Sequence, residues 1–252
     1  MKIDRPTASE TAQLLQLWKT AFGDHGGFWE MFLDTAFTPE HCRCITENVA
    51  VTAALYWFDC LCGGQTCAYV YAVVTHPRHR NRGLCRKLLE DTQNHLKEQG
   101  YSSVLLVPEQ ESLRQMYGKL GYRSCTTVSE FSCAAGAAPV SLRAIGPEEY
   151  AALRREMLPR GGVVQEGENL SFLAAQAQLF AGENLLLAAY MEEDTLHAME
   201  LLGDPEAAPG IVAAVGCKEG HFRGPGQDRP FAMVYPLTGD ALVPDYFGFA
   251  FD

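Results

Sequence analysis

A strand that runs directly into a basic, glycine-containing loop lies in the first third of this 252-residue chain. Residues 71–74 read Tyr-Ala-Val-Val, and Pro77, which has no N–H to donate, ends the strand soon afterwards. Five arginines and lysines fall between positions 78 and 87, and a helical pattern begins at Gly83. Successive N–H groups in such a loop, together with the positive end of the helix dipole, favour a bound phosphate. An ordinary solvated basic turn is the alternative, but this clustering is unusual in a chain with a formal net charge of −11.

A second segment that could do chemistry follows at residues 111–122. An acidic residue, Glu111, suits the start of a helix, and Gly121 stands where a glycine commonly ends one. Residues 117–122 read Tyr-Gly-Lys-Leu-Gly-Tyr. A phenol such as that of Tyr117 can hydrogen-bond or protonate a leaving thiolate as negative charge develops on it. The alternative for Tyr117 is a packed ring with a hydrated hydroxyl.

Together the two segments resemble the GNAT superfamily of N-acetyltransferases. Residues 80–86, Arg-Asn-Arg-Gly-Leu-Cys-Arg, are similar to the signature Arg/Gln-x-x-Gly-x-Gly/Ala that holds the pyrophosphate of acetyl-CoA. The longer form, Arg-x-Arg-Gly-Leu-x-Arg, looks most like the enhanced-intracellular-survival-type branch, which tolerates a larger residue where Cys85 stands here. Residues 117–122 resemble the second signature of the family, Tyr-x-Lys-x-Gly-Phe/Tyr.

The resemblance implies an enzyme that transfers acetyl from acetyl-CoA to a primary amine by direct attack, with Tyr117 as general acid. It implies that acetyl-CoA is held by Val73, Val74, Thr75, Arg80, Asn81, Arg82, Gly83, Leu84, Cys85 and Arg86. A helix N-terminus beside arginines would also favour the thiolate of Cys85. The alternative function is a catalytically weak CoA-binding or regulatory module, and a third is an interaction protein with a chance match in the loop.

Two carboxylates are candidates for the base that takes the proton of the amine. Glu109 follows the apolar run at residues 104–107, although a glutamate in a loop is usually solvated. In the resembled branch, the C-terminal carboxylate reaches the active site, and here residues 246–252 read Tyr-Phe-Gly-Phe-Ala-Phe-Asp. We therefore expect a terminal strand that brings Asp252 near the cleft of the first domain. The alternative is a strand of a second domain with a solvated end.

The elements that must position these residues are predicted by patterning. Thr7 and Glu10 form a capping-box pattern before an amphipathic helix, and a second helix carries the aromatic residues of positions 28–37, which we interpret as core. Gly63 and Gly64 make the turn between two strands. The resulting order, β-α-α-β-β-β-α-β-α-β, is the GNAT order as the resemblance implies: an α/β (α+β) fold with a mixed central sheet flanked by helices.

The chain is predicted to contain two domains. Residues 1–135 would form the GNAT catalytic domain that binds acetyl-CoA, and the small residues of positions 133–140 read as a linker. Residues 136–252 would form a smaller α/β domain, a degenerate GNAT-like repeat whose terminal strand, at residues 246–251, could complete the active-site region. This half has no counterpart of the basic loop, so a single acetyl-CoA site is expected in the first half.

Composition excludes several other classes of protein. The chain is 47% hydrophobic and 20% charged, contains no apolar run long enough to cross a membrane, and begins without the apolar segment of a signal peptide, so we expect a cytoplasmic protein. Its nine cysteines include no Cys-x-x-Cys, and no metal site is expected. The acidic balance argues against a nucleic-acid partner and suits a cationic amine acceptor, either a small molecule or a peptide. No membrane partner is expected, and association into a homo-oligomer is left open.

Overall fold

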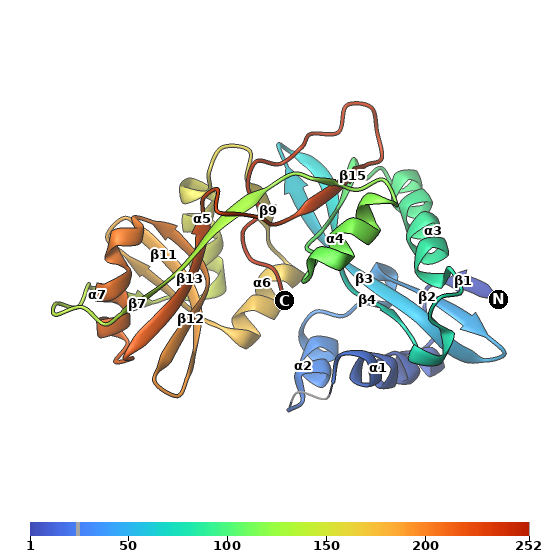
Figure 1. Ribbon diagram of the computed structural model, residues 1–252, viewed down its shortest axis with the longest axis horizontal. Coiled ribbons are helices and arrows are strands. Elements are labelled where there is room, and N and C mark those ends of the chain that lie inside the picture. Colours follow the sequence, from blue (N-terminus) through green and yellow to red (C-terminus); the bar gives the residue numbers. More distant parts are fainter. Residues whose placement is uncertain (24–25, 252) are drawn as a thin grey trace. The chain divides into compact units, whose positions relative to one another are not determined.

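The computed structural model describes residues 1–23 and 26–251, which form two compact units, each with its own sheet (Figure 1). The first unit contains Met1–Leu106, Gln110–Arg123 and Val234–Leu242. The second contains Val107–Glu109, Ser124–Met233 and the chain from Val243 onward. The expected fold class, a mixed α/β protein with helices flanking mixed sheets, is confirmed.

The first unit is built on a sheet in the order β1-β2-β3-β4-β5-β15-β6. Its strands are β1 (Lys2–Asp4), β2 (Cys42–Glu47), β3 (Ala50–Cys62), β4 (Gln65–Thr75), β5 (Ser103–Leu106), β15 (Met233–Pro236) and β6 (Arg123–Ser124). Its helices are α1 (Ala8–Phe22), α2 (Phe28–Thr35), α3 (Leu84–Glu98) and α4 (Glu111–Gly118), with short 3-10 turns at Pro39–His41 and Pro77–His79.

Local sequence explains where these elements begin and end. The Glu10 carboxylate accepts the backbone N–H of Thr7 at 2.8 Å, the reciprocal bond of a capping box, and α1 starts at the next residue. Gly63 and Gly64 both have positive φ, 55° and 82°, as the tightest two-residue hairpin requires, and they join β3 to β4. Gly100, with φ of 88°, follows the end of α3.

The aromatic residues of α1 and α2 form the core on one face of the first sheet. Trp18 stacks on Trp29 with ring centroids 5.5 Å apart, and Phe32 meets the ring of Tyr56 edge-on at 5.0 Å. The side chain of Trp57 points to the opposite face, where it contacts His95 of α3. The interpretation of these aromatics as core is therefore confirmed.

The second unit repeats the topology of the first. Its sheet has the order β14-β7-β13-β12-β11-β10-β8. The strands of this sheet are β7 (Thr127–Ala134), β8 (Leu142–Ala144), β10 (Gln178–Gly182), β11 (Leu185–Glu192), β12 (Thr195–Gly203), β13 (Glu219–Pro225) and β14 (Arg229–Pro230). The short strand β9 (Val163–Gln165) also lies in this stretch of the chain but is not part of this sheet. The helices are α5 (Pro147–Met157), α6 (Glu168–Gln176) and α7 (Ala208–Ala214), with a 3-10 turn at Pro205–Ala207. Strands β8, β10, β11, β12 and β13 pair as β1 to β5 do, with the last pair parallel in both units.

Strands β7 and β15 are exchanged between the two sheets relative to their order in the sequence. The strand at residues 127–134, expected to end the first domain, pairs with β13 and β14 of the second unit. In the first sheet, β15 lies between β5 and β6 instead. The division into units therefore falls after Arg123, and not near residue 135, because each sheet includes a strand from a distant part of the sequence.

The predicted terminal strand is wrong as secondary structure. Residues 247–251 are buried but pair with no strand of the described chain, and Tyr246 makes only an isolated bridge with Gly162. Side chains of the second unit hold the segment in place: the Gln165 amide donates to the Phe249 carbonyl at 2.7 Å, and the Phe172 ring packs against Phe251.

A buried carboxylate fixes this end of the chain. Glu200 is fully buried and accepts bonds from Arg154 (2.7 and 3.0 Å), from the Tyr150 hydroxyl (2.8 Å) and from the Tyr246 hydroxyl (3.0 Å). A side chain at Gly248 would meet these groups, since its Cβ would lie 2.0 Å from a Glu200 oxygen. Both lone-pair regions of the carboxylate are thus satisfied inside the protein, as a buried charge requires.

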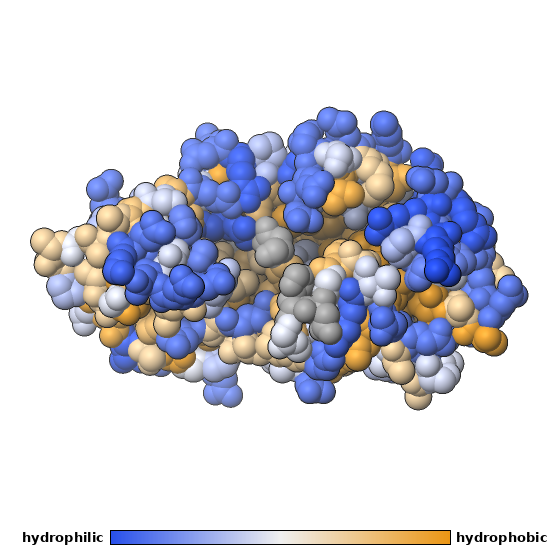
Figure 2. Space-filling model, turned by 60° about the horizontal axis from the view of Figure 1, so that its bottom comes forward, coloured by the Kyte–Doolittle hydropathy of each residue, from blue (hydrophilic) through white to orange (hydrophobic). Residues whose placement is uncertain are grey.

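The surface is largely polar. Hydrophilic residues cover most of the face seen in Figure 2, with smaller apolar areas between them, and few large apolar side chains of the described residues are exposed. No helix among the described residues combines the length and apolar character that a membrane crossing needs.

Replacing Glu200 by Ala should destabilise the protein by about 3–5 kcal/mol, because Arg154 would be left buried without a counter-charge. Urea unfolding measures this change. The matched control is Glu149→Ala, which breaks an Arg–Glu pair of similar geometry with Arg143 on the surface and should cost much less, because water screens an exposed pair. Equal effects of the two substitutions would contradict the assignment.

Candidate active site

The site begins where β4 parts from its parallel neighbour. The ladder between β4 and β5 covers Cys67 to Tyr69, whereas β4 itself continues to Thr75. A bulge lies in this last stretch: the register with β3 shifts between Ala54 and Tyr56, and Ala72 has a positive φ of 51°. Residues 73–75 of β4 therefore lie beyond the end of the ladder with β5. On the β5 side of the strand, the main-chain groups of these residues can bind an extended ligand.

A buried indole holds the bulge. Trp18 of α1 donates its Nε1–H to the Ala72 carbonyl at 3.1 Å. Sequence reasoning missed this role, since the two residues are 54 positions apart and nothing local to either one points to the other. The bulge is thus positioned by the same aromatic core that holds α1 and α2 to the sheet.

The loop after β4 leads into α3, and the first N–H groups of this helix have no acceptor within the helix. His76 donates its backbone N–H to the Thr52 carbonyl at 2.9 Å, which ties the loop to β3. Asn81 and Gly83 have positive φ values of 63° and 73°, and α3 begins at the following residue. The first helical bond runs from Lys87 to the Gly83 carbonyl, so the preceding N–H groups of the first turn have no helical acceptor.

No side chain caps this helix, and no acidic residue lies in its first turn. Both features are unusual for a helix N-terminus, where a side-chain oxygen or a carboxylate normally satisfies the free N–H groups. The open turn has the donors and the dipole that a phosphate would need.

The arginines of the loop differ in their partners. Arg82 makes a two-pronged pair with Glu47 at 3.0 and 3.2 Å, and His79 lies 3.4 Å from the same carboxylate. The Nε of Arg80 donates to the Thr75 carbonyl at 3.3 Å. Among the described residues, neither Arg80 nor Arg86 has a carboxylate partner, so the charge of both is available to an anion.

Tyr117 lies near the end of α4, where it packs edge-on against the ring of Tyr122 at 5.6 Å. Burial raises the pKa of its phenol well above 10, and the nearby Cys85 and Tyr122 groups raise the pKa further. No described residue hydrogen-bonds its hydroxyl, whereas the Tyr122 hydroxyl accepts from the Gln93 amide at 3.2 Å. Tyr117 is therefore a neutral, unengaged donor.

Cys85, in the first turn of α3, is close enough to Tyr117 to affect its pKa. An ionised Cys85 would raise the pKa of both Tyr117 and Tyr122, so Cys85 lies in the neighbourhood of both phenols. The expectation of a thiolate is wrong, because burial raises the pKa of Cys85 to about 11. Desolvation of the charged form outweighs the helix dipole here.

Two carboxylates were predicted as candidates for the base. Glu109 is exposed and clusters with the second unit. Asp252 lies outside the described residues. No group of metal-binding side chains was found among the residues described, and all nine cysteines are free thiols.

The equivalent position of the second unit differs in charge and in packing. The turn between β12 and α7 contains Asp204 and Glu206 in place of arginines, and the Asp204 carboxylate accepts the Glu206 N–H at 3.0 Å. The parallel strands also stay in contact there, since a Cβ at Gly224 would lie 2.7 Å from the Leu201 carbonyl oxygen. In this turn the Asp204 carboxylate already occupies a backbone N–H that an anion could bind. The neighbouring strands β12 and β13 do not separate beside it as β4 and β5 do.

Comparison with known proteins agrees with this geometry. Residues 2–125 match the family model for an acetyltransferase (GNAT) domain. A search of curated proteins found no match.

Several solved structures share the fold over most of the chain. A GCN5-related N-acetyltransferase from Anabaena variabilis has a TM-score of 0.73 at 14% identity, covering 94% of this chain and 73% of that one. One from Kribbella flavida has a TM-score of 0.69 at 16% identity, with 93% and 70% covered. Eis1 from Mycobacterium abscessus has a TM-score of 0.68 at 13% identity, with 94% and 74% covered.

The Cys85 thiol should react slowly with iodoacetamide at neutral pH. With a pKa of about 11, only about a thousandth of the thiol is ionised at pH 8. Because the raised pKa keeps the thiol protonated at lower pH, its alkylation rate should keep rising up to about pH 11. Mass spectrometry of the Cys85 peptide measures the rate, with a small free thiol in the same tube as reference. A plateau below pH 9 would show that the thiol is not desolvated.

Proposed function

We propose, on the premise that this chain belongs to the GNAT acetyltransferase family through residues 2–125, that it transfers the acetyl group of acetyl-CoA to a primary amine. The observation that carries the proposal is the uncapped first turn of α3, preceded by an arginine-rich loop and facing a neutral, buried tyrosine. The acceptor amine attacks the thioester carbonyl directly, the new C–N bond forms, and the C–S bond to CoA breaks.

We assign the pyrophosphate of acetyl-CoA to the first turn of α3. The N–H groups of Gly83, Leu84, Cys85 and Arg86 and the side chains of Arg80 and Arg86 would hold it. Asn81 and Gly83 give the loop the left-handed backbone that turns these N–H groups toward one point. Arg82 would contribute by shaping the loop through its pair with Glu47.

The pantetheine arm is assigned to the free edge of β4. Main-chain groups of Val73, Val74 and Thr75 would bind its amides as an additional strand would, on the side where the ladder with β5 has ended. This placement runs the arm from the pyrophosphate loop along β4, with the thioester at its far end.

Tyr117 is assigned to the leaving sulfur. A thiol has a pKa near 8.5, well below that of this buried phenol, so the hydrogen bond that Tyr117 donates as charge develops is its main contribution. The base remains a prediction, with Glu109 and Asp252 as its candidates; a chain of water molecules could also take the proton.

The general test is release of free CoA from acetyl-CoA with a panel of primary amines, against a control without amine. Turnover with at least one amine above the control supports acetyl transfer. Calorimetric binding of CoA without turnover on a broad panel would instead identify a CoA-binding module.

Replacing Tyr117 by Phe should lower kcat by about 10²-fold or more, while the affinity for acetyl-CoA changes little. Tyr122→Phe is the matched control, because it removes a neighbouring buried hydroxyl that is already bonded to Gln93. Since the Tyr117 phenol stays protonated below pH 10, kcat should show no loss from this group as pH rises to 10. An unchanged kcat in Tyr117→Phe would refute the assignment.

Replacing Arg86 by Ala should weaken acetyl-CoA binding by about tenfold and reduce its dependence on salt, because a cation that faces the pyrophosphate is lost. Arg78→Ala removes the same charge from the 3-10 turn of the same loop and serves as control. Calorimetry with CoA measures both variants. Equal losses would mean that general charge, and not a specific contact, holds the cofactor.

A further inference from the structure

Beyond His76, side chains tie the loop between β4 and α3 to the rest of the first unit. Among the described residues, the backbone hydrogen bonds of positions 77–82 reach no further than His76. Arg82 makes the outward contact, because it donates to the two carboxylate oxygens of Glu47 at 3.0 and 3.2 Å. The same guanidinium also donates to His79 Nδ1 at 2.7 Å. One arginine therefore joins the turn of the loop to a carboxylate on β2.

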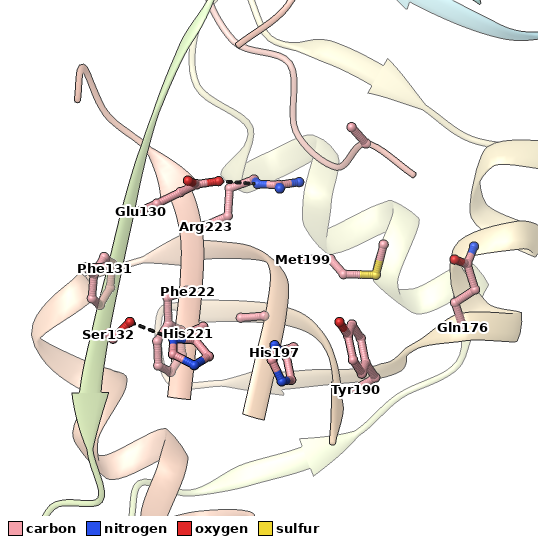
Figure 3. Close-up of a pocket in the computed structure, with 12 residues that line it drawn as sticks. Glu130, Phe131, Ser132, Gln176, Tyr190, His197, Met199, His221, Phe222 and Arg223 are labelled. Carbon is pink, nitrogen blue, oxygen red and sulfur yellow. Dashed lines mark hydrogen bonds and ion pairs between the residues drawn. The ribbon is translucent and has the colours of Figure 1, made fainter. Parts of the chain in front are cut away.

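An arginine–carboxylate pair of the second unit shows what is different about this contact. Glu130 on β7 accepts Nε of Arg223 on β13 at 3.0 Å, and the two residues are direct register partners in the sheet (Figure 3). The ladder of backbone bonds already fixes both positions, so that pair adds little to the placement of either strand. Arg82 belongs to no strand or helix, and its pair with Glu47 can therefore decide where the loop lies.

Glu47 ends β2 at a turn with an unfavourable backbone. Asn48 and Val49 follow it with positive φ values of 47° and 65°, and Ala50 begins β3. Asparagine tolerates the left-handed region, but a β-branched residue rarely adopts it. The Val49 side chain is 87% exposed, so its own packing does not compensate for this backbone. A strained turn of this kind persists only where its surroundings hold it.

Helix α1 holds the turn from outside. The Gln13 amide donates to the Val49 carbonyl at 3.2 Å and accepts the Val51 N–H at 3.0 Å. A single side chain thus bonds the backbone of the turn and of the strand that leaves it. Because Gln13 lies in the second turn of α1, the position of the turn after Glu47 is set by this helix.

The neighbouring residue fixes the direction of Glu47. The Thr46 hydroxyl donates to the Glu10 carboxylate of α1 at 2.6 Å. Helices α1 and α3 cover opposite faces of this sheet (Figure 1). Since successive side chains of a strand point to opposite faces, Glu47 is directed away from α1 and toward the loop that precedes α3.

We propose that Glu47 is a positioning residue for the pyrophosphate of acetyl-CoA, an inference that rests on the proposed function. Its carboxylate keeps Arg82 in place. Arg82 in turn keeps the left-handed backbone at Asn81 and Gly83, which aims the N–H groups of the first turn of α3. By charge alone Glu47 would oppose binding, because it neutralises an arginine beside an anion site. Position and charge therefore predict effects of opposite sign when the carboxylate is removed.

Calorimetry with CoA on the full-length protein separates the two effects. Glu47→Ala should weaken CoA binding by about three- to fivefold, the upper range for a partly exposed ion pair, although it removes a negative charge from beside an anion site. Gln13→Ala, which changes no charge and does not touch the loop, should weaken binding by a smaller factor. The matched control Glu130→Ala also removes a carboxylate paired with arginine, and should leave CoA binding unchanged. Unchanged or tighter binding in Glu47→Ala, by a protein whose thermal unfolding is unaltered, would overturn the proposal.

Steady-state kinetics give a readout that a merely structural role would not move. Glu47 lies at the pyrophosphate end of the proposed site, so Glu47→Ala should raise KM for acetyl-CoA and leave kcat at saturation nearly unchanged. A lower kcat with an unchanged KM would contradict the assignment.

Limited trypsin digestion tests the hold on the loop without a ligand. Cleavage after Arg80, followed by mass spectrometry, should be about three- to fivefold faster in Glu47→Ala and unchanged in Glu130→Ala. The Arg80 site is suitable because its side chain bonds the Thr75 carbonyl and not Glu47. Equal cleavage of Glu47→Ala and the unaltered protein would contradict the role of Glu47. If the unaltered protein binds no CoA, the proposed function fails, and the digestion still decides whether Glu47 holds the loop.

Discussion

The short parallel ladder between β4 and β5 is the constraint on which the first unit depends. Three residue pairs join the two strands, and β4 then continues alone through the bulge at Ala72 to Thr75. A parallel pair needs a crossover between its strands, and here that crossover is α3. The end of β4 and the start of α3 therefore meet beside an edge of sheet whose main-chain groups are not used by the ladder. In the proposed site, the loop, the helix dipole and the strand edge serve one ligand because a single topological feature brings them together.

The second unit shows what happens when the same topology lacks this opening. It has the same strand order, the same parallel pair and the same crossover, yet Gly224 lets β13 stay against the Leu201 carbonyl. The crossover turn carries Asp204, which satisfies a backbone N–H that a phosphate would otherwise bind. The fold alone therefore does not make a phosphate site. The proposed phosphate site depends on both the basic loop and the parting of the strands, and among the described residues only the first unit has both.

The sequence was sufficient wherever the signal is local. The capping box at Thr7 and the glycine pair of the β3–β4 hairpin each depend on a few adjacent residues, and both are confirmed. The exchange of β7 and β15 could not be foreseen, because the partners of both strands lie far away in sequence. The terminal segment had the alternation of a strand, but its backbone is held by side chains such as Gln165. Pairing over such distances leaves no periodic trace in either segment.

Burial explains both the wrong prediction for Cys85 and the proposed role of Tyr117. From sequence, Cys85 is at a helix N-terminus beside arginines, and those features alone would lower its pKa. Burial instead withdraws both Cys85 and Tyr117 from water, and desolvation raises the pKa of each group. For a nucleophilic thiol this environment would be a defect. For a phenol that must remain protonated while a thiolate leaves, it is suitable, because a neutral donor in a site of low polarity stabilises developing charge more strongly than it would in water. The same desolvation that makes Cys85 inert is therefore what fits Tyr117 for its proposed role.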